Sequence, residues 1–193
     1  MTPEELAALH GAHADDPHGF WLTQARRLDW ERFPTKPGDW SYDAADFHIQ
    51  WYEDGILNLS VNCLDRHLAT RANDTALIFE PDEPGTGRSV TYAELHAETC
   101  RLANLLKERG VAKGDRVIIY LPNMPEAAAA MLACARIGAV HSVVFGGFSP
   151  ESLAGRIADC GARTVITADE GVRGGKTIPL KANVEFLAMT VSQ

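Results

Sequence analysis

Three short apolar runs alternate with two helical patterns between Asp115 and Thr167, and this order constrains the fold more than any other feature of the chain. The runs are Val117–Leu121, Ala139–Phe145 and Thr164–Thr167. A β-α-β-α-β order is typical of a parallel sheet with helices packed against it. The runs are nearly continuous in valine and isoleucine, as expected for strands covered on both faces. We therefore predict an α/β fold.

Local signals predict where both helices begin and end. Asn123 is the expected N-cap of the first helix, and Pro125 suits its first turn because proline lacks an N–H that would stay unpaired there. Gly138 is expected to end this helix in the left-handed conformation. The second helix is predicted from Ser149 to Gly161. The residues expected on its buried face recur at helical spacing and are Leu153, Ile157 and Cys160.

Two loops follow strands of this predicted sheet, at the edge where open α/β sheets bind ligands. Phe145–Ser149 contains two glycines, which let a backbone or a flat ligand approach closely. Ala168–Pro179 carries Arg173 and Lys176, and two cations at this spacing can hold a phosphate through charge-assisted hydrogen bonds. A solvated turn with two unrelated charges is the alternative. The segment Gly171–Thr177 lacks one residue of the phosphate-loop spacing, so we reject that motif.

The segment before the sheet predicts a helix over Leu59–Thr70 and a pair of strands over Thr75–Glu80 and Arg88–Val90, joined by a turn rich in proline and glycine. Thr91 and Glu94 form a predicted capping box for a further helix that ends at Gly110. The leucines expected to point inward from it are Leu95, Leu102, Leu105 and Leu106.

Residues 1–60 are predicted to be an irregular, aromatic-rich arm, with short helices at Pro3–His10 and around Phe20–Leu28. We expect this arm to lay its rings on the surface of a folded body formed by residues 61–193. A stacking platform for single-stranded nucleic acid would need basic residues between the rings, but Asp and Glu prevail there.

Charge and hydropathy exclude several classes of partner. The net charge of −8 argues against nucleic acid and against an anionic membrane surface. No apolar run approaches the roughly 20 residues of a membrane helix, and the first residues lack the pattern of a secretion signal. We therefore expect a cytoplasmic protein with neither a nucleic-acid nor a membrane partner.

The cysteines are predicted to be buried, reduced thiols rather than disulfides or metal ligands, because they are far apart in sequence. Cys63 and His67 have a spacing that suits a metal, but no further ligands lie nearby in sequence. We expect a core thiol and a histidine on the helix surface, and no metal site.

Three long blocks of the sequence carry a specific resemblance. NCLDRHL, KGDRVIIYLPNMPEAAAAMLACARIGAVHSVVFGGFSPE and VITADEGVRGGKTIPLKANV closely resemble acetate–CoA ligases (acetyl-CoA synthetases) of the adenylate-forming superfamily, from about Trp21 to Val184. The resemblance implies the N-terminal portion of the large adenylate-forming domain. It also implies a reaction in which acetate and MgATP give acetyl-adenylate and pyrophosphate, and CoA then accepts the acetyl group and releases AMP.

The same resemblance implies a site for the nucleotide of CoA. Phe145, Gly146 and Gly147 would line its adenine, and Arg173 would hold its 3′-phosphate. Lys176 would help to bind this phosphate, at a position where many relatives have arginine. Its contact would differ, because arginine binds a phosphate bidentately whereas lysine acts as a point charge. The remaining residues assigned to this site are Gly174, Gly175 and Ile178.

The family's ATP, acetate and magnesium sites match nothing in this sequence, and the resemblance implies relatives roughly three times as long. We therefore expect a truncated subdomain that is inactive alone, poorly soluble or loosely folded, with no catalytic residue of its own. The alternatives are part of a propionate–CoA ligase, or a separate module that binds CoA or another nucleotide. An NAD-binding domain would need a glycine motif where Leu121–Asn123 stands.

Overall fold

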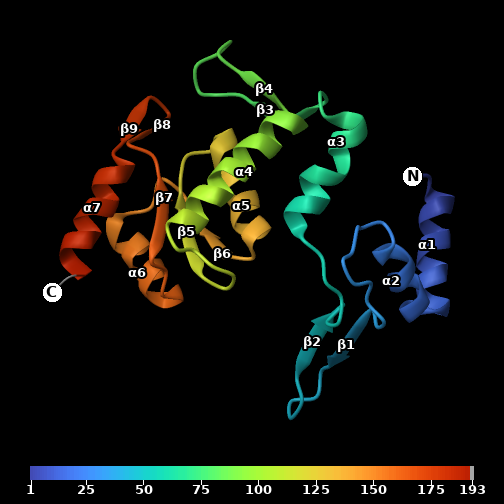
Figure 1. Ribbon diagram of the computed structural model, residues 1–193. Helices are drawn as coiled ribbons and strands as arrows, with labels where there is room; N and C mark the ends of the chain where they lie inside the picture. The colour runs from blue at the N-terminus through green and yellow to red at the C-terminus, as the bar shows by residue number, and fades with distance from the viewer. Residues whose placement is uncertain (192–193) are drawn as a thin grey trace. The chain divides into compact units, whose positions relative to one another are not determined.

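The computed structural model describes residues 1–191, and side chains through residue 185. The chain divides into two compact units, Met1–Asn58 and Leu59–Gln193. Figure 1 labels the elements of each unit along the chain. The second unit holds the predicted sheet and is described first.

The predicted parallel sheet is confirmed. Its strands are β5 (Arg116–Tyr120), β6 (Val140–Val143) and β7 (Thr164–Thr167), in the spatial order β6-β5-β7. Both neighbours pair with β5 in parallel. The central strand is the most deeply buried, and Val117 through Tyr120 are fully inaccessible to solvent. This burial explains the continuous apolar run that predicted the strand.

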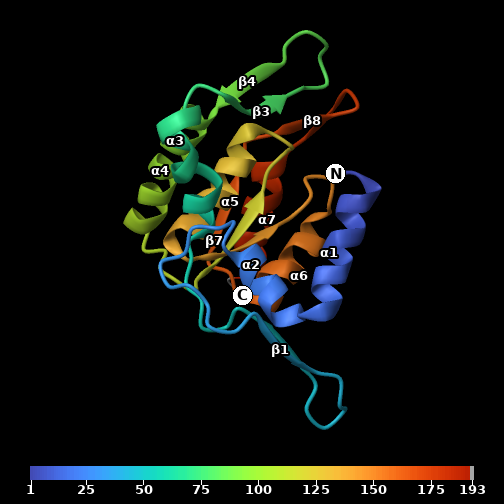
Figure 2. The ribbon, with the colours of Figure 1, turned by 90° about the vertical axis from the view of Figure 1, so that its right-hand side faces the viewer.

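Alternate residues of β5 point into two separate cores, one on each face of the sheet. Val117 and Ile119 pack with α4 (Tyr92–Glu108) and α5 (Pro125–Ile137). Ile118 and Tyr120 pack with α6 (Pro150–Cys160) and α7 (Leu180–Val191). Figures 1 and 2 show the sheet between these two helix layers.

The helix ends agree with the local signals except at one residue. Gly138 and Gly161 end α5 and α6 in the left-handed conformation, with φ of 74° and 61°. The Ser149 hydroxyl caps α6 by accepting the N–H of Ser152. The expected Asn123 cap is wrong, since the N-cap of α5 is Met124 and no side chain caps this end. Pro125 occupies the first turn and favours an extended residue before it, which puts Asn123 one position too early.

The segment ahead of the sheet folds largely as predicted. A π-helical turn over Val61–Asp65 leads into α3 (Arg66–Arg71), and β3 (Thr75–Phe79) pairs antiparallel with β4 (Arg88–Thr91). Thr91 and Glu94 form the capping box of α4. The backbone N–H of Thr91 donates to the Glu94 carboxylate, and the backbone N–H of Glu94 donates to the Thr91 hydroxyl.

Two side chains of this segment were predicted to be buried and are exposed. Leu105 is 45% exposed, because the buried stripe of α4 runs through Leu95, Thr99 and Leu106, and Leu105 lies about 100° around the helix from Leu106. Cys63 is also exposed, whereas Cys134 is fully buried. Burial raises the pKa of the Cys134 thiol to about 11. All four cysteines are free.

An ion pair ties α5 to the end of the π-helical turn. Arg136 donates two hydrogen bonds to the carboxylate of Asp65, each 2.8 Å long. Both side chains are about three-quarters buried, at 24% and 29% exposure. The hydrogen bond from Arg136 is the main reason that the pKa of Asp65 lies below its ordinary value.

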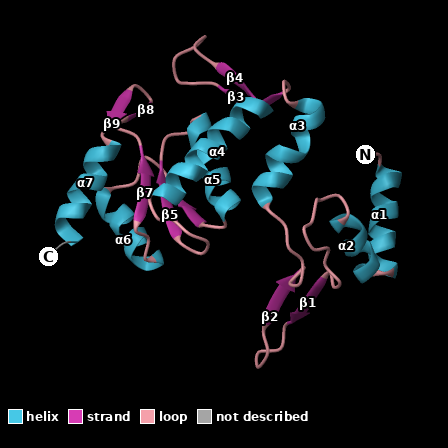
Figure 3. Cartoon of the chain, in the orientation of Figure 1, coloured by secondary structure: helices cyan, strands magenta, loops and turns pink. Residues whose placement is uncertain are grey.

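The first unit is more regular than predicted. It contains α1 (Pro3–Asp15), α2 (Pro17–Ala25) and an antiparallel hairpin of β1 (Gly38–Ser41) with β2 (His48–Trp51). Figure 3 shows these elements in cyan and magenta. The hairpin was missed because its strands have four residues each and no glycine turn joins them.

Aromatic rings of this unit pack against one another. Trp51 stacks on Trp40, with ring centroids 5.5 Å apart, and meets the edge of Trp21 at 5.2 Å. The Tyr52 hydroxyl donates to the backbone carbonyl of Trp21 over 2.9 Å. That the rings also cover another part of the chain stays a prediction.

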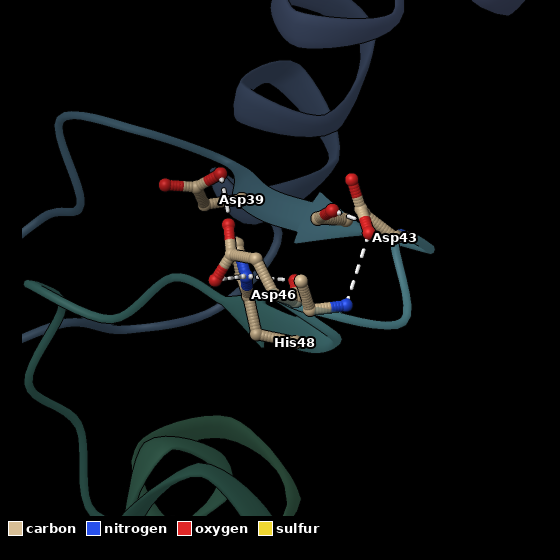
Figure 4. A network of polar contacts seen from close by, with 6 residues as sticks. Asp39, Asp43, Asp46 and His48 are labelled. Atoms are coloured by element: carbon tan, nitrogen blue, oxygen red, sulfur yellow. Dashed lines mark hydrogen bonds and ion pairs between the residues drawn. The ribbon is translucent and has the colours of Figure 1, made fainter.

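One histidine of the hairpin lies between two carboxylates, as Figure 4 shows. The ring nitrogens of His48 lie 3.3 Å from Asp39 on β1 and 3.3 Å from Asp46 in the connecting loop. The hydrogen bond to Asp39 is the main reason that the pKa of His48 lies above its ordinary value. Among residues 1–191, no helix is both long and apolar enough to cross a bilayer.

Candidate functional site

A cleft of about 680 Å³ opens in the second unit, at the carboxyl ends of β5 and β6. One wall is built by Leu121–Met124, which follows β5, and by Phe145–Gly147, which follows β6. The segment after β7 supplies Glu170–Arg173, and the end of β3 with the loop that follows it supplies Phe79–Glu83. Strand order brings the first three segments together, because parallel strands end at the same edge of the sheet.

A buried tyrosine holds the glycine segment in place. The hydroxyl of Tyr120, at the end of β5, lies 3.3 Å from the Gly146 carbonyl and 3.2 Å from the Phe148 carbonyl, and donates to them. It also accepts a 3.2 Å hydrogen bond from the side-chain amide of Asn183 on α7. The central strand therefore sets the position of this wall of the cleft. The sequence concealed this role, because Tyr120 reads as one more apolar residue of the strand.

Arg173 and Phe145 meet across the cleft. The guanidinium of Arg173 lies over the Phe145 ring, 4.7 Å from its centroid, in cation–π geometry. Phe145 also contacts Phe148 edge-on, with centroids 6.0 Å apart. A Cβ atom at Gly147 would stand 2.7 Å from the Phe145 ring and 3.2 Å from the Arg173 guanidinium, so a larger residue there would displace the Phe145 ring.

The segment after β7 forms a hairpin, although it was predicted to be a loop. β8 (Gly171–Arg173) pairs antiparallel with β9 (Lys176–Ile178), and Gly174 and Gly175 make the two-residue turn with φ of 55° and 72°. Two positive φ angles are typical of a type I′ turn, for which Gly-Gly is a recognised signal. The sequence therefore held this signal, and the hairpin sets Arg173 directly opposite Lys176.

The structure brings together five of the eight residues assigned to the site. Phe145, Gly146, Gly147, Arg173 and Ile178 all line the cleft. Gly174, Gly175 and Lys176 form the tip of the hairpin and are not among the lining residues.

The cleft also has an acidic side that the sequence analysis missed. The carboxylates that line it are those of Glu80, Asp82, Glu83 and Glu170. Asp82 accepts a 2.9 Å hydrogen bond from the backbone N–H of Gly174, at the hairpin tip. The signal was the acid-rich turn after β3, which reads only as a surface loop until the fold places it beside the hairpin. Among the side chains described, no three histidine, cysteine or acidic residues gather where they would hold a metal ion.

Two known protein families match this chain, and their matches follow one another along residues 6–190. A family described as "AMP-binding enzyme" matches residues 64–190, and one described as "Acetyl-coenzyme A synthetase N-terminus" matches residues 6–63. A protein named acetyl-coenzyme A synthetase from Caulobacter vibrioides is 64% identical over 93% of this chain. Proteins of the same name from Parvibaculum lavamentivorans and Bradyrhizobium diazoefficiens are 60% and 59% identical, over 96% and 92% of it. The chain spans only 27% to 29% of the length of these relatives.

Proposed function

Because this chain belongs to the AMP-binding enzyme family, we propose that it takes part in the acetate–CoA ligase reaction by binding the nucleotide of CoA. In that reaction acetate and MgATP give acetyl-adenylate and pyrophosphate, and CoA then accepts the acetyl group. We assign ATP and magnesium to residues other than those of this cleft. The substrates are small molecules, and we propose the cytoplasm as the compartment, where free cysteines such as these stay reduced.

The observation that carries this proposal is the meeting of Arg173 and Phe145 at the cleft. A flat apolar ring beside two glycines offers a surface for an adenine, and Phe145 keeps 45% of its surface exposed. The exposed guanidinium of Arg173 offers donors for a phosphate. The two groups that a phosphorylated nucleoside needs therefore lie side by side.

The charges of the cleft support a defined orientation of the nucleotide. Arg173 and Lys176 face each other at the hairpin, so we place the 3′-phosphate there. The carboxylates of Glu80 and Glu170 lie on the lining. They would repel a phosphate but can accept hydrogen bonds from the amino group of an adenine.

Isothermal titration calorimetry with CoA and with 3′-dephospho-CoA tests this function. The wild-type chain should bind CoA more tightly, and Arg173→Ala should weaken CoA binding by about ten- to a hundredfold, since a charge-assisted hydrogen bond contributes about 1.5–3 kcal/mol. The variant should bind dephospho-CoA almost as the wild type does. Arg163→Ala is the matched control. This exposed arginine directly precedes β7, at the amino ends of the parallel strands, whereas the cleft lies at their carboxyl ends.

Two results would contradict the assignment. Equal affinity of the wild type and Arg173→Ala for CoA would remove the phosphate role of this arginine. Acetate-dependent release of pyrophosphate by the chain alone would show that it does more than bind the CoA nucleotide.

A further inference from the structure

The loop between β3 and β4 is tied to the hairpin that carries the two cations. Asp82, in that loop, and Gly174, at the hairpin tip, are 92 residues apart in sequence, and the N–H of Gly174 donates to Oδ2 of Asp82 over 2.9 Å. Both residues are exposed, and the bond between them lies at the surface, in contact with solvent. A single hydrogen bond of this kind opens and closes readily.

The Gly174 N–H is a donor that an anion would use. Gly174 and Gly175 have positive φ angles, and Arg173 and Lys176 flank them on the paired strands. Backbone N–H groups in such turns, together with neighbouring cations, are typical contacts of phosphate oxygens. In this structure that N–H instead donates its hydrogen bond to the carboxylate of Asp82.

We propose that Asp82 competes with the anionic ligand of the cleft for the hairpin tip, and thereby lowers the affinity for a nucleotide with a phosphate at that end. This inference rests on the proposed function, since it takes the 3′-phosphate of CoA as the competing group. The ligand must displace the carboxylate before its phosphate reaches the Gly174 N–H. The apparent affinity then equals the intrinsic affinity multiplied by the fraction of molecules in which the tip is open.

Asp82 differs in this respect from the other acids of the cleft. Glu80, Glu83 and Glu170 line it as well, but only Asp82 bonds to the hairpin tip among the contacts of the described residues. The effect should therefore depend on this one contact. A general repulsion between an acidic surface and an anion would respond to removal of any nearby carboxylate.

Binding of CoA and 3′-dephospho-CoA to the full chain separates these cases. Asp82→Asn removes the charge, and Asp82→Ala removes the acceptor as well. Both should bind CoA about three- to tenfold more tightly than the wild type, as expected when one exposed hydrogen bond to a carboxylate no longer competes. Affinity for dephospho-CoA should stay the same, because that ligand has no phosphate to place at the tip.

Asp169→Asn is the matched control for net charge. It removes one carboxylate from the same end of the sheet, where Asp169 pairs with Lys181 at 3.5 Å and does not line the cleft. An equal gain in CoA affinity in this control would overturn the role of the Asp82 contact. Weaker CoA binding by Asp82→Ala, with an unchanged circular dichroism spectrum, would show that Asp82 supports the hairpin instead, and would also overturn the proposal.

The outcomes distinguish this inference from the proposed function. If the wild type binds CoA and both Asp82 variants bind it equally well, only the competition fails. If neither the wild type nor the variants bind CoA, the proposed function fails and the competition fails with it. Detectable CoA binding by the Asp82 variants alone would support both.

Discussion

Replacing Tyr120 with phenylalanine should loosen one wall of the cleft while leaving the core intact. The ring of Tyr120 is fully buried between the sheet and α6–α7, and phenylalanine keeps that packing. What is lost is the hydroxyl, which donates toward the carbonyls of Gly146 and Phe148 and accepts from Asn183. The Phe145–Phe148 segment then loses the hydrogen bonds that join it to the Tyr120 side chain of the central strand.

The size of the effect follows from the geometry. The two contacts in which the hydroxyl donates are 3.3 and 3.2 Å long, whereas O–H···O bonds are usually 2.7–2.8 Å, and one proton serves both carbonyls. The bond from the Asn183 amide, at 3.2 Å, also exceeds the usual 2.9–3.0 Å of an N–H···O bond. We therefore count two weak hydrogen bonds, each at the low end of about 0.5–1.5 kcal/mol. The free energy of unfolding of this unit should fall by about 1–1.5 kcal/mol. CoA affinity should fall by about three- to tenfold, because Gly146 and Phe145 no longer hold one position.

Urea unfolding followed by two signals measures this change. All four tryptophans lie in the unit Met1–Asn58, so their fluorescence reports that unit, whereas circular dichroism at 222 nm also reports the helices around the sheet. Tyr120→Phe should shift the dichroism transition and leave the fluorescence transition in place. Calorimetric titration with CoA gives the affinity.

Tyr52→Phe is the matched control, because its hydroxyl also donates to a backbone carbonyl, that of Trp21, but in the other unit. It should shift the fluorescence transition and leave CoA affinity unchanged. Unchanged stability and CoA affinity in Tyr120→Phe would refute the argument that this hydroxyl positions the glycine segment. A loss of about 3 kcal/mol or more would also refute it, since that size indicates disrupted packing.

Two further changes test the fold itself. Asp65→Asn should lower the free energy of unfolding by about 1–2 kcal/mol at pH 7, because it weakens a bidentate, partly exposed pair. Since the pKa of Asp65 is lowered in the folded chain, its stabilisation is complete above the unfolded value of about 3.9 and is lost progressively as the pH falls below that value and through the lower folded one. Urea titrations of wild type and variant should therefore converge as the pH falls below about 4, and a constant difference would contradict the ion-pair explanation. Gly138→Ala should destabilise by about 1–2 kcal/mol because φ is 74° there, whereas Gly155→Ala, inside α6 with open space around it, should stabilise by about 0.5–1 kcal/mol. Effects of the same sign at both glycines in thermal unfolding would be inconsistent with the assigned backbone conformations.

Elements with strong local signals were predicted well. The capping box at Thr91, the cap at Ser149 and the glycines at Gly138 and Gly161 each act within a few residues of their position. Such signals are readable because the interactions behind them are formed by neighbours in sequence.

Predictions that depended on distant neighbours were less reliable. Cys63 reads as a core thiol in an apolar helix, yet its side chain is exposed. Leu105 fails for a similar reason, because the contacts with α5 and the sheet select which stripe of α4 is buried. The β8–β9 hairpin shows the reverse case, in which a local Gly-Gly signal was present and its flanking strands were too short to read.

The sequence by itself determined the class of the fold, the parallel order of strands and helices, and the resemblance that pointed to Phe145, Gly147 and Arg173. Only the tertiary structure decided that Arg173 lies over Phe145, that Tyr120 anchors the glycine segment and that Asp82 occupies the hairpin tip. The physical reason is the range of the interactions. Periodicity and capping depend on residues within a single turn or strand. The cleft is instead made by segments as distant in sequence as Phe79 and Arg173, which meet only after the strands pair in the order β6-β5-β7.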